Sequence, residues 1–141
     1  MRPVHRQILA LLLLAAIPAL GAALVHPKRP QWDRQVLAEG EVDLRAAGEW
    51  KLKVLWVDAR PREQFEAGHI PGALLLNSFE WEHLLDPFLD EWSRERVVIV
   101  YCDSVECDLS RQVAEKLRKE VQIPEVYVLK GGWKTWRESQ K

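Results

Sequence analysis

The stretch Val97-Val-Ile-Val-Tyr101, which Cys102 follows directly, is the clearest strand signal in the chain. Its residues are apolar and mostly β-branched, which favours a strand whose two faces are both buried. Three other short apolar runs share this character: Val54–Val57, Ala73–Leu76 and Val126–Leu129. We therefore expect several buried strands, with the strand before Cys102 at the centre of the sheet.

Segments with helical character separate these strands. The expected helices lie at 61–68, 78–92, 109–117 and 133–138. In the second of them Ser78 is a candidate N-terminal cap, and Pro87 predicts a kink or a division into two shorter helices. Strands that alternate with helices are typical of a parallel α/β sheet. Ligands bind beyond the carboxyl ends of the strands in such sheets, so the residues that follow each strand are candidates for a site.

The bulk composition indicates one globular domain with an N-terminal extension. The chain has 141 residues, of which 48% are hydrophobic and 29% charged, as in folded rather than disordered proteins. A formal net charge of -1 gives no general attraction to nucleic acid, so no nucleic acid partner is expected. The two cysteines argue against a disulfide-rich scaffold. The expected division is 1–25 as a signal or anchor segment, 26–45 as linker and N-terminal extension, and 46–141 as the domain.

Residues 8–25 carry no charge and follow the basic residues Arg2 and Arg6. A cleaved signal peptide and an uncleaved membrane anchor both fit this pattern. The run stays apolar past the candidate cleavage site, which favours an anchor, although about 20 apolar residues are usual for one. The basic start favours a cytoplasmic N-terminus, with the domain outside the cytoplasm, in the periplasm. Lys28 and Arg29 on the other side weaken this orientation, and cleavage would instead give an exported soluble form.

Cys102 is the first candidate for chemistry, because it directly follows the central strand and precedes a polar loop that leads into a helix. Backbone N–H groups in such a loop, together with the helix N-terminus, lower the pKa of a thiol and favour the reactive thiolate. The alternative is a small apolar residue that merely ends a buried strand. Position alone leaves both interpretations open.

Three motifs then resemble, in order, the signatures of rhodanese-like domains. They are Val57-Asp-Ala-Arg60 with Glu63-Gln-Phe65 and Gly68-His-Ile-Pro-Gly-Ala73, then Tyr101-Cys102 after its strand, then Leu129-Lys-Gly-Gly-Trp133 with Trp136. The resemblance covers residues 54–138. In the last motif, Gly131-Gly132 is expected to let the backbone pass close to another loop, that of Cys102.

The resemblance implies a parallel sheet flanked by helices on both faces, here preceded by an N-terminal hydrophobic helix. It also implies that Cys102 takes sulfur from a donor such as thiosulfate, holds it as a persulfide and passes it to a thiol or other acceptor. No cofactor is implied. Around His69 no cluster has metal-ligand spacing, so no metal is expected. The residues expected to support the site are Asp58, Arg60, His69, Lys130 and Arg111.

The active-site loop departs from the family pattern, because it is longer and acidic. It comprises Asp103, Ser104, Val105, Glu106, Cys107, Asp108, Leu109 and Ser110. Its three carboxylates are expected to raise the pKa of the thiol and to repel an anionic donor. Asp108 has a second interpretation as the N-terminal cap of the helix that follows.

Cys107 lies in the same loop as Cys102. It is a candidate to resolve the persulfide as a disulfide, to form a redox or structural disulfide with Cys102, or to be only a loop residue. Three functions follow: a sulfurtransferase, a binding or regulatory module without transferase activity, and a redox element that uses both cysteines. The sequence does not identify the sulfur donor, the acceptor or the oligomeric state.

Overall fold

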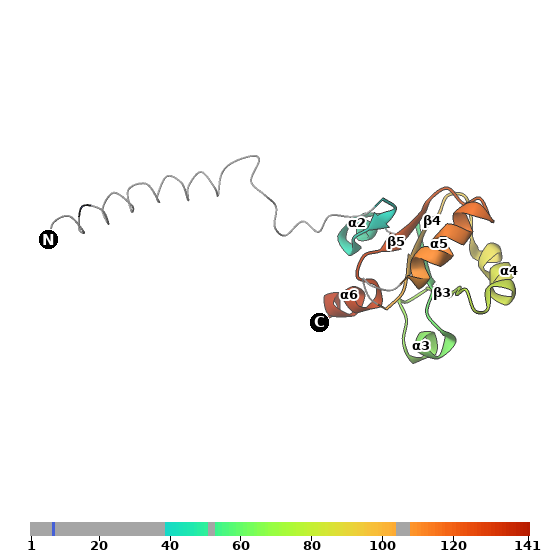
Figure 1. Ribbon diagram of the computed structural model, residues 1–141, viewed down its shortest axis with the longest axis horizontal. Helices are drawn as coiled ribbons and strands as arrows, with labels where there is room; N and C mark the ends of the chain where they lie inside the picture. Colours follow the sequence, from blue (N-terminus) through green and yellow to red (C-terminus); the bar gives the residue numbers. More distant parts are fainter. Residues whose placement is uncertain (1–6, 8–38, 51–52, 104–107) are drawn as a thin grey trace. The chain divides into compact units, whose positions relative to one another are not determined.

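A parallel sheet of five strands, in the order β1-β5-β4-β2-β3, organises the part of the chain that the structure describes (Figure 1). The structure is a computed structural model and describes residues 7, 39–50, 53–103 and 108–141. The strands are β1 (Glu41–Val42), β2 (Val54–Asp58), β3 (Leu74–Leu75), β4 (Val97–Tyr101) and β5 (Val126–Leu129). Because every pairing is parallel, the carboxyl ends of all these strands lie at one edge of the sheet.

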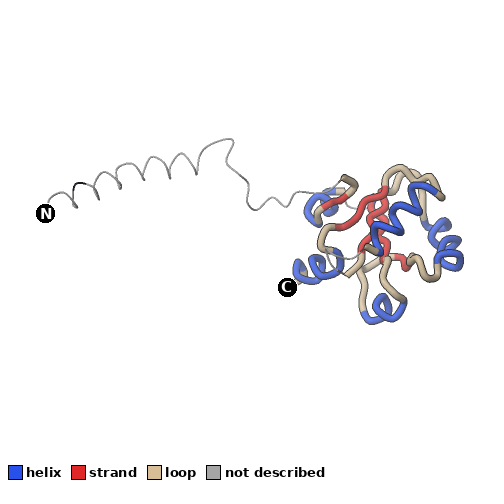
Figure 2. Tube along the Cα trace, in the orientation of Figure 1, coloured by secondary structure: helices blue, strands red, loops and turns tan. Residues whose placement is uncertain are grey.

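The helices are α2 (Leu44–Glu49), α3 (Arg62–Ala67), α4 (Trp81–Glu91), α5 (Leu109–Lys119) and α6 (Gly132–Ser139). They lie on both sides of the strands (Figure 2). One core cluster holds the buried side chains of α4 and α5, and a second holds those of α2 with the tryptophans of α6. The expected α/β sheet with helices on both faces is confirmed.

The central strand β4 supplies both clusters. Val98 and Val100 belong to the cluster with α4 and α5, whereas Ile99 and Tyr101 belong to the cluster with α2 and α6. All four side chains are fully buried. A strand buried on both faces requires apolar residues at every position, which is why this stretch is the strongest strand signal in the sequence.

Two expectations about α4 are wrong. The helix is not divided into two at Pro87, and its buried residues Trp81 and Phe88, on either side of the proline, pack in the same core cluster. Ser78 does not cap it: the helix begins at Trp81, and the Glu80 N–H donates to Asn77 Oδ1 at 2.8 Å. Asn77 thus holds the turn that leads into α4, a helix without a side-chain cap hydrogen bond, and the Ser78 hydroxyl is buried without a hydrogen-bond partner in the described residues.

The N-terminal region is described only in part. The expected hydrophobic helix at 8–25 lies outside the described residues, and within those residues no helix has the length and apolar character needed to cross a membrane. The stretch 26–45 includes β1 and the first residues of α2. Hydrogen bonds from Val128 N to Gly40 O and from Lys130 N to Val42 O, both 2.9 Å, join this stretch to β5.

Candidate functional site

Cys102 directly follows the carboxyl end of β4. Because β4 is the central strand, Cys102 lies in the middle of the row of carboxyl-terminal strand ends. Its side chain is buried, with 2% of its surface exposed. Its Sγ lies 3.2 Å from the hydroxyl of Ser110, in the first turn of α5. The carbonyl oxygen of Cys102 accepts a hydrogen bond of 2.7 Å from Trp133 N at the start of α6. Two helix N-termini therefore meet at this residue.

The sulfur atom of Cys102 is part of a disulfide bond in the structure. The only other cysteine in the sequence is Cys107, which lies with Ser104, Val105 and Glu106 outside the described residues. Cys102 is thus present in its oxidised form, and its reactivity as a thiolate belongs to the reduced protein.

The described ends of the active-site loop are fixed by backbone and surface contacts. Asp103 is exposed, and its carbonyl oxygen accepts a hydrogen bond of 3.1 Å from Lys134 N. Asp108 is the N-cap residue of α5, as expected, but its carboxylate makes no cap hydrogen bond. It binds Arg111 Nη1 at 3.0 Å instead. Leu109 opens the helix.

Arg111, which was expected to support the site, forms ion pairs with two carboxylates. Its other terminal nitrogen binds the carboxylate of Glu41 in β1 at 3.1 Å. The hydrogen bonds to Glu41 and then to Asp108 raise the pKa of the Arg111 guanidinium. This arginine ties α5 to the edge strand, and two carboxylates already offset its charge.

Asp58 and Arg60 form a buried ion pair behind the site. Arg60 Nη2 lies 2.6 Å from Asp58 Oδ2, and the two residues are 3% and 0% exposed. Arg60 also donates to the carbonyl oxygen of Gly68 at 2.7 Å and lies 4.8 Å from the centre of the Trp133 ring. Burial opposes the charge of the guanidinium, but the hydrogen bonds and charge of Asp58 outweigh burial and raise the pKa of Arg60. The pair joins the loop after β2 to α6.

His69 and Lys130 occupy neighbouring loops. His69 Nδ1 lies 2.8 Å from the carbonyl oxygen of Phe65, and the two rings stack 3.9 Å apart, so the histidine braces α3 against the turn that follows. Lys130 follows β5, and its backbone N–H continues the pairing with β1. Among the described residues no group of histidine, cysteine, aspartate and glutamate side chains is arranged to hold a metal ion.

Tyr101 is a site residue that sequence reasoning treated only as part of a motif. Its hydroxyl oxygen accepts a hydrogen bond of 3.1 Å from Ile70 N, and its ring is fully buried. Burial, and then the negative charge of Asp58, place the pKa of Tyr101 well above its ordinary value. The phenol therefore stays protonated and links β4 to the loop before β3.

We expect this buried phenol to make stability fall at alkaline pH. Tyrosine in the unfolded chain ionises near about pH 10. Above that pH the unfolded state releases a proton that the native state keeps, so the free energy of unfolding declines by up to about 1.4 kcal/mol per pH unit from this group. Denaturant titrations between about pH 9 and about pH 11 should show a shallower decline for Tyr101→Phe than for the wild type. Equal slopes would contradict the assignment.

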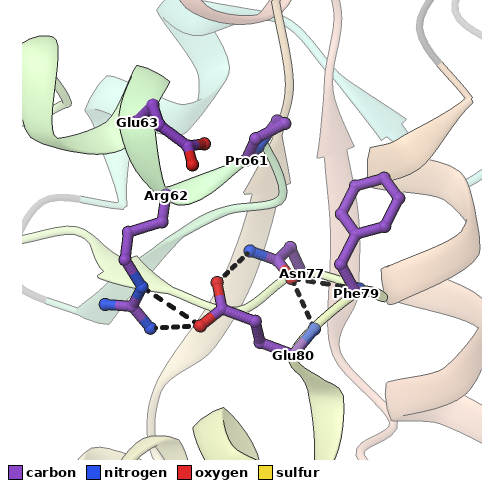
Figure 3. A pocket seen from close by; sticks show the side chains of 6 residues that line it. All are labelled: Pro61, Arg62, Glu63, Asn77, Phe79 and Glu80. Atoms are coloured by element: carbon purple, nitrogen blue, oxygen red, sulfur yellow. Dashed lines mark hydrogen bonds and ion pairs between the residues drawn. The ribbon is translucent and has the colours of Figure 1, made fainter.

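Asn77 organises the loop after β3, a role that was not predicted from the sequence. Its side chain is fully buried. Asn77 Oδ1 accepts hydrogen bonds from the N–H groups of Phe79 and Glu80 (Figure 3). Its Nδ2 donates to Arg60 O at 3.2 Å. A cavity of about 430 Å³ opens here beside the exposed Phe79 and the ion pair of Arg62 with Glu80. The signal for Asn77 in the sequence was its place as a polar residue directly after the apolar run Ala73–Leu76.

Comparisons with known proteins agree with this geometry. The chain is 34% identical over 93 residues to the HTH-type transcriptional regulator Rv0324 of Mycobacterium tuberculosis, covering 66% of this chain and 37% of the regulator. It is 32% identical over 83 residues to the thiosulfate sulfurtransferase GlpE of Shewanella oneidensis, covering 59% of this chain and 75% of that enzyme. The rhodanese-like domain of the Alr3790 protein from Anabaena matches with a TM-score of 0.56 and 28% identity, covering 72% and 76% of the two chains.

A parallel sheet with a cysteine at the carboxyl end of its central strand, between two helix N-termini, defines the class of the protein. The rhodanese-like domain model matches residues 41–139, and the chain belongs to that family. The chain spans 37% of the length of the first relative named above.

Proposed function

We propose that the domain is a sulfurtransferase in which reduced Cys102 carries sulfur as a persulfide. The Cys102 thiolate attacks the outer sulfur of a donor such as thiosulfate, a new S–S bond forms, and sulfite leaves with the electron pair of the broken bond. An acceptor thiolate then attacks the terminal sulfur of the persulfide. The bond between this sulfur and Cys102 breaks, which returns the Cys102 thiolate.

The placement of Cys102 carries this proposal. Its Sγ is 3.2 Å from the Ser110 hydroxyl at the start of α5, and its own backbone is bound by the start of α6. The Ser110 hydroxyl and the N-terminus of α5 favour negative charge on the sulfur atom, and the start of α6 fixes the backbone that carries this sulfur. The similarity to GlpE, a thiosulfate sulfurtransferase, supports the same chemistry.

A second candidate function, a redox element, rests on a separate observation. Cys102 is disulfide-bonded in the structure, so a thiol reductant must first open this bond before sulfur transfer begins. If opening and closing the bond were the function, both Cys102 and Cys107 would be required and no sulfur donor would be needed. The sulfurtransferase predicts a persulfide on Cys102, whereas the redox element predicts a disulfide that opens and closes reversibly.

Intact mass spectrometry of the full chain separates the candidates. The protein would be measured as isolated, after reduction with removal of the reductant, and after addition of thiosulfate. We expect the reduced protein to gain one sulfur atom, and Cys102→Ser to gain none. Ser110→Ala is the matched control, because it removes the nearby hydroxyl but keeps the thiol, and we expect it to load sulfur more slowly.

The proposal fails if reduced wild-type protein gains no sulfur from thiosulfate. Reversible loss of two hydrogens that either Cys102→Ser or Cys107→Ser abolishes would then leave the redox element. If neither change occurred, the domain would act as a binding module without covalent chemistry.

We also propose, from the sequence alone, that residues 8–25 attach the domain to a membrane and that it faces outside the cytoplasm. An oxidising compartment of that kind is where a disulfide such as that of Cys102 persists. Membrane fractionation of the full chain with and without residues 1–25 tests this: only the full chain should sediment with membranes.

A further inference from the structure

A cavity of about 610 Å³ lies at the edge of the sheet where the strands begin. Its lining comes from the segment that leads from α4 into β4 and from the segment that leads from α5 into β5. The lining residues are Trp92, Arg94, Arg96, Val121, Gln122, Ile123, Pro124 and Glu125. Because the strands are parallel and Cys102 follows the end of β4, this cavity is separate from the proposed sulfur site. We call it the amino-edge pocket.

The floor of the amino-edge pocket is part of the apolar core. Ile123 is buried and belongs to the core cluster of α4 and α5, and the half-buried Trp92 and Val121 pack against the same cluster. Pro124 adds exposed apolar surface. The volume is within the usual range of about 300–1,000 Å³ for ligand pockets, whose walls combine apolar side chains with a few polar groups. This floor is suited to the apolar body of a small molecule.

Arg96 is held in place at the pocket by uncharged partners. Its Nη1 donates to the carbonyl oxygen of Glu91 at the end of α4, and its Nη2 donates to the carbonyl oxygen of Val54 at the start of β2, both at 3.2 Å. A guanidinium has five N–H groups, so these two bonds leave others unused. Arg96 therefore offers a fixed positive charge and further hydrogen-bond donors to a ligand.

The net charge of the lining indicates the class of ligand. Within the described ranges no ion pair involves Arg94, Arg96 or Glu125. On α5, by contrast, Lys116 and Lys119 each have a glutamate one turn away. Two arginines and one carboxylate therefore line the pocket, and a ligand with a single negative charge balances them. A compact dianion would be repelled by the carboxylate and would gain nothing from the apolar floor.

Trp92 contributes a hydrogen-bond donor that has no acceptor. Its indole Nε1 is buried without a partner in the described part of the chain. An unpaired buried donor is unfavourable, and a ligand with oxygen acceptors offers this group a partner, whereas a purely apolar ligand does not. Because the ring lines the pocket, its N–H proton is also a local reporter of whatever binds there.

We propose that the amino-edge pocket binds a small organic monocarboxylate with an aromatic or aliphatic body. Arg94 and Arg96 bind the carboxylate. The apolar body packs on the floor formed by Trp92, Val121 and Ile123. Binding involves no covalent step and no contact with Cys102, so this inference goes beyond the proposed function and does not depend on it.

Titration with 3-phenylpropionate and with its uncharged analogue 3-phenylpropanamide tests the proposal. The full chain would be kept at constant pH and ionic strength while the indole N–H signal of Trp92 is followed by NMR, and Trp92→Phe identifies this signal among the seven tryptophans. We expect a saturable shift with the carboxylate and at least about tenfold weaker binding of the amide. Absence of the shift, or equal binding of the two compounds, would overturn the proposal.

Two single substitutions should change the affinity in opposite directions. Arg94→Gln should raise the Kd for 3-phenylpropionate about fivefold, and Glu125→Gln should lower it about twofold. Both side chains are exposed and outside the ion pairs of the described residues, so both variants should keep the fold. Lys119→Gln is the matched control for Arg94→Gln, because it removes one exposed positive charge outside the pocket and should leave the Kd unchanged. An equal effect of Lys119→Gln would mean that only the general charge of the surface attracts the carboxylate, and the pocket would be rejected.

Two further measurements separate this pocket from a general anion site and from the sulfur site. We expect inorganic phosphate at equal concentration not to displace 3-phenylpropionate, since displacement would show a site that ignores the apolar body. We expect Cys102→Ser to bind 3-phenylpropionate as the wild type does, and loss of binding in that variant would place the ligand at the other edge of the sheet. Binding by a protein that gains no sulfur from thiosulfate would reject the sulfurtransferase and keep the pocket.

Discussion

Replacing Asp58 with alanine is expected to lower the free energy of unfolding by about 3–5 kcal/mol, because it leaves a buried guanidinium without its counter-charge. Arg60 is 3% exposed, and both oxygens of Asp58 bind it, at distances from 2.6 to 3.1 Å. After the change, the partners that Arg60 keeps among the described residues are the carbonyl oxygen of Gly68 and the faces of two aromatic rings. Urea denaturation of the two proteins measures the difference.

The chain offers a matched control at its surface. Arg62 and Glu80 also form an ion pair, at 2.6 Å, but their side chains are 46% and 33% exposed. Water replaces the lost partner there, so Arg62→Ala should cost less than about 1 kcal/mol. A double change, Asp58→Asn with Arg60→Met, removes both charges and should cost less than Asp58→Ala alone. If Asp58→Ala were as mild as Arg62→Ala, the buried pair would not support the site as described.

The order of elements was accessible from the sequence because buried parallel strands leave little choice of residue. β4 is apolar at every position since both of its faces enter a core cluster, and the strand before Cys102 was therefore recognisable without a partner strand. The ends of α4 were not accessible in this way. Asn77 rather than Ser78 accepts the N–H group of Glu80, the residue before the helix, and only the bend of the chain after β3 decides which of the two polar residues reaches it.

The place of Cys102 in the fold was predictable from the sequence, whereas the contacts that surrounding side chains make were less so. The sequence places Cys102 after the central strand, and the structure has it there. It does not show that Arg111 turns toward Glu41 in β1, since the two residues meet only when α5 and the edge strand are assembled. Nor does it show that Lys134 and Arg137 line a cavity with Asp103. Contacts between residues distant along the chain depend on packing angles that periodicity does not encode.

Gly132→Ala is expected to destabilise the protein by at least about 3 kcal/mol, through both backbone strain and overlap. Gly132 has φ +53°, in the left-handed region that side chains disfavour, and a Cβ there would overlap the carbonyl oxygen of Cys102 and stand 2.9 Å from its carbonyl carbon. The expected close approach to the loop of Cys102 is confirmed at Gly132 by this contact and by the hydrogen bond from Trp133 N.

Gly48→Ala is the control for Gly132→Ala. Gly48 lies inside α2, and a Cβ there would have no atom within 4 Å, so alanine should stabilise the helix by about 0.5–1 kcal/mol. The two substitutions add the same methyl group and are expected to shift the denaturation midpoint in opposite directions. Because relief of the overlap at Gly132 requires α6 to move away from β4, the Gly132→Ala protein that remains folded should also load sulfur at Cys102 more slowly. Similar midpoints for the two variants would mean that the first turn of α6 is not fastened to the end of β4.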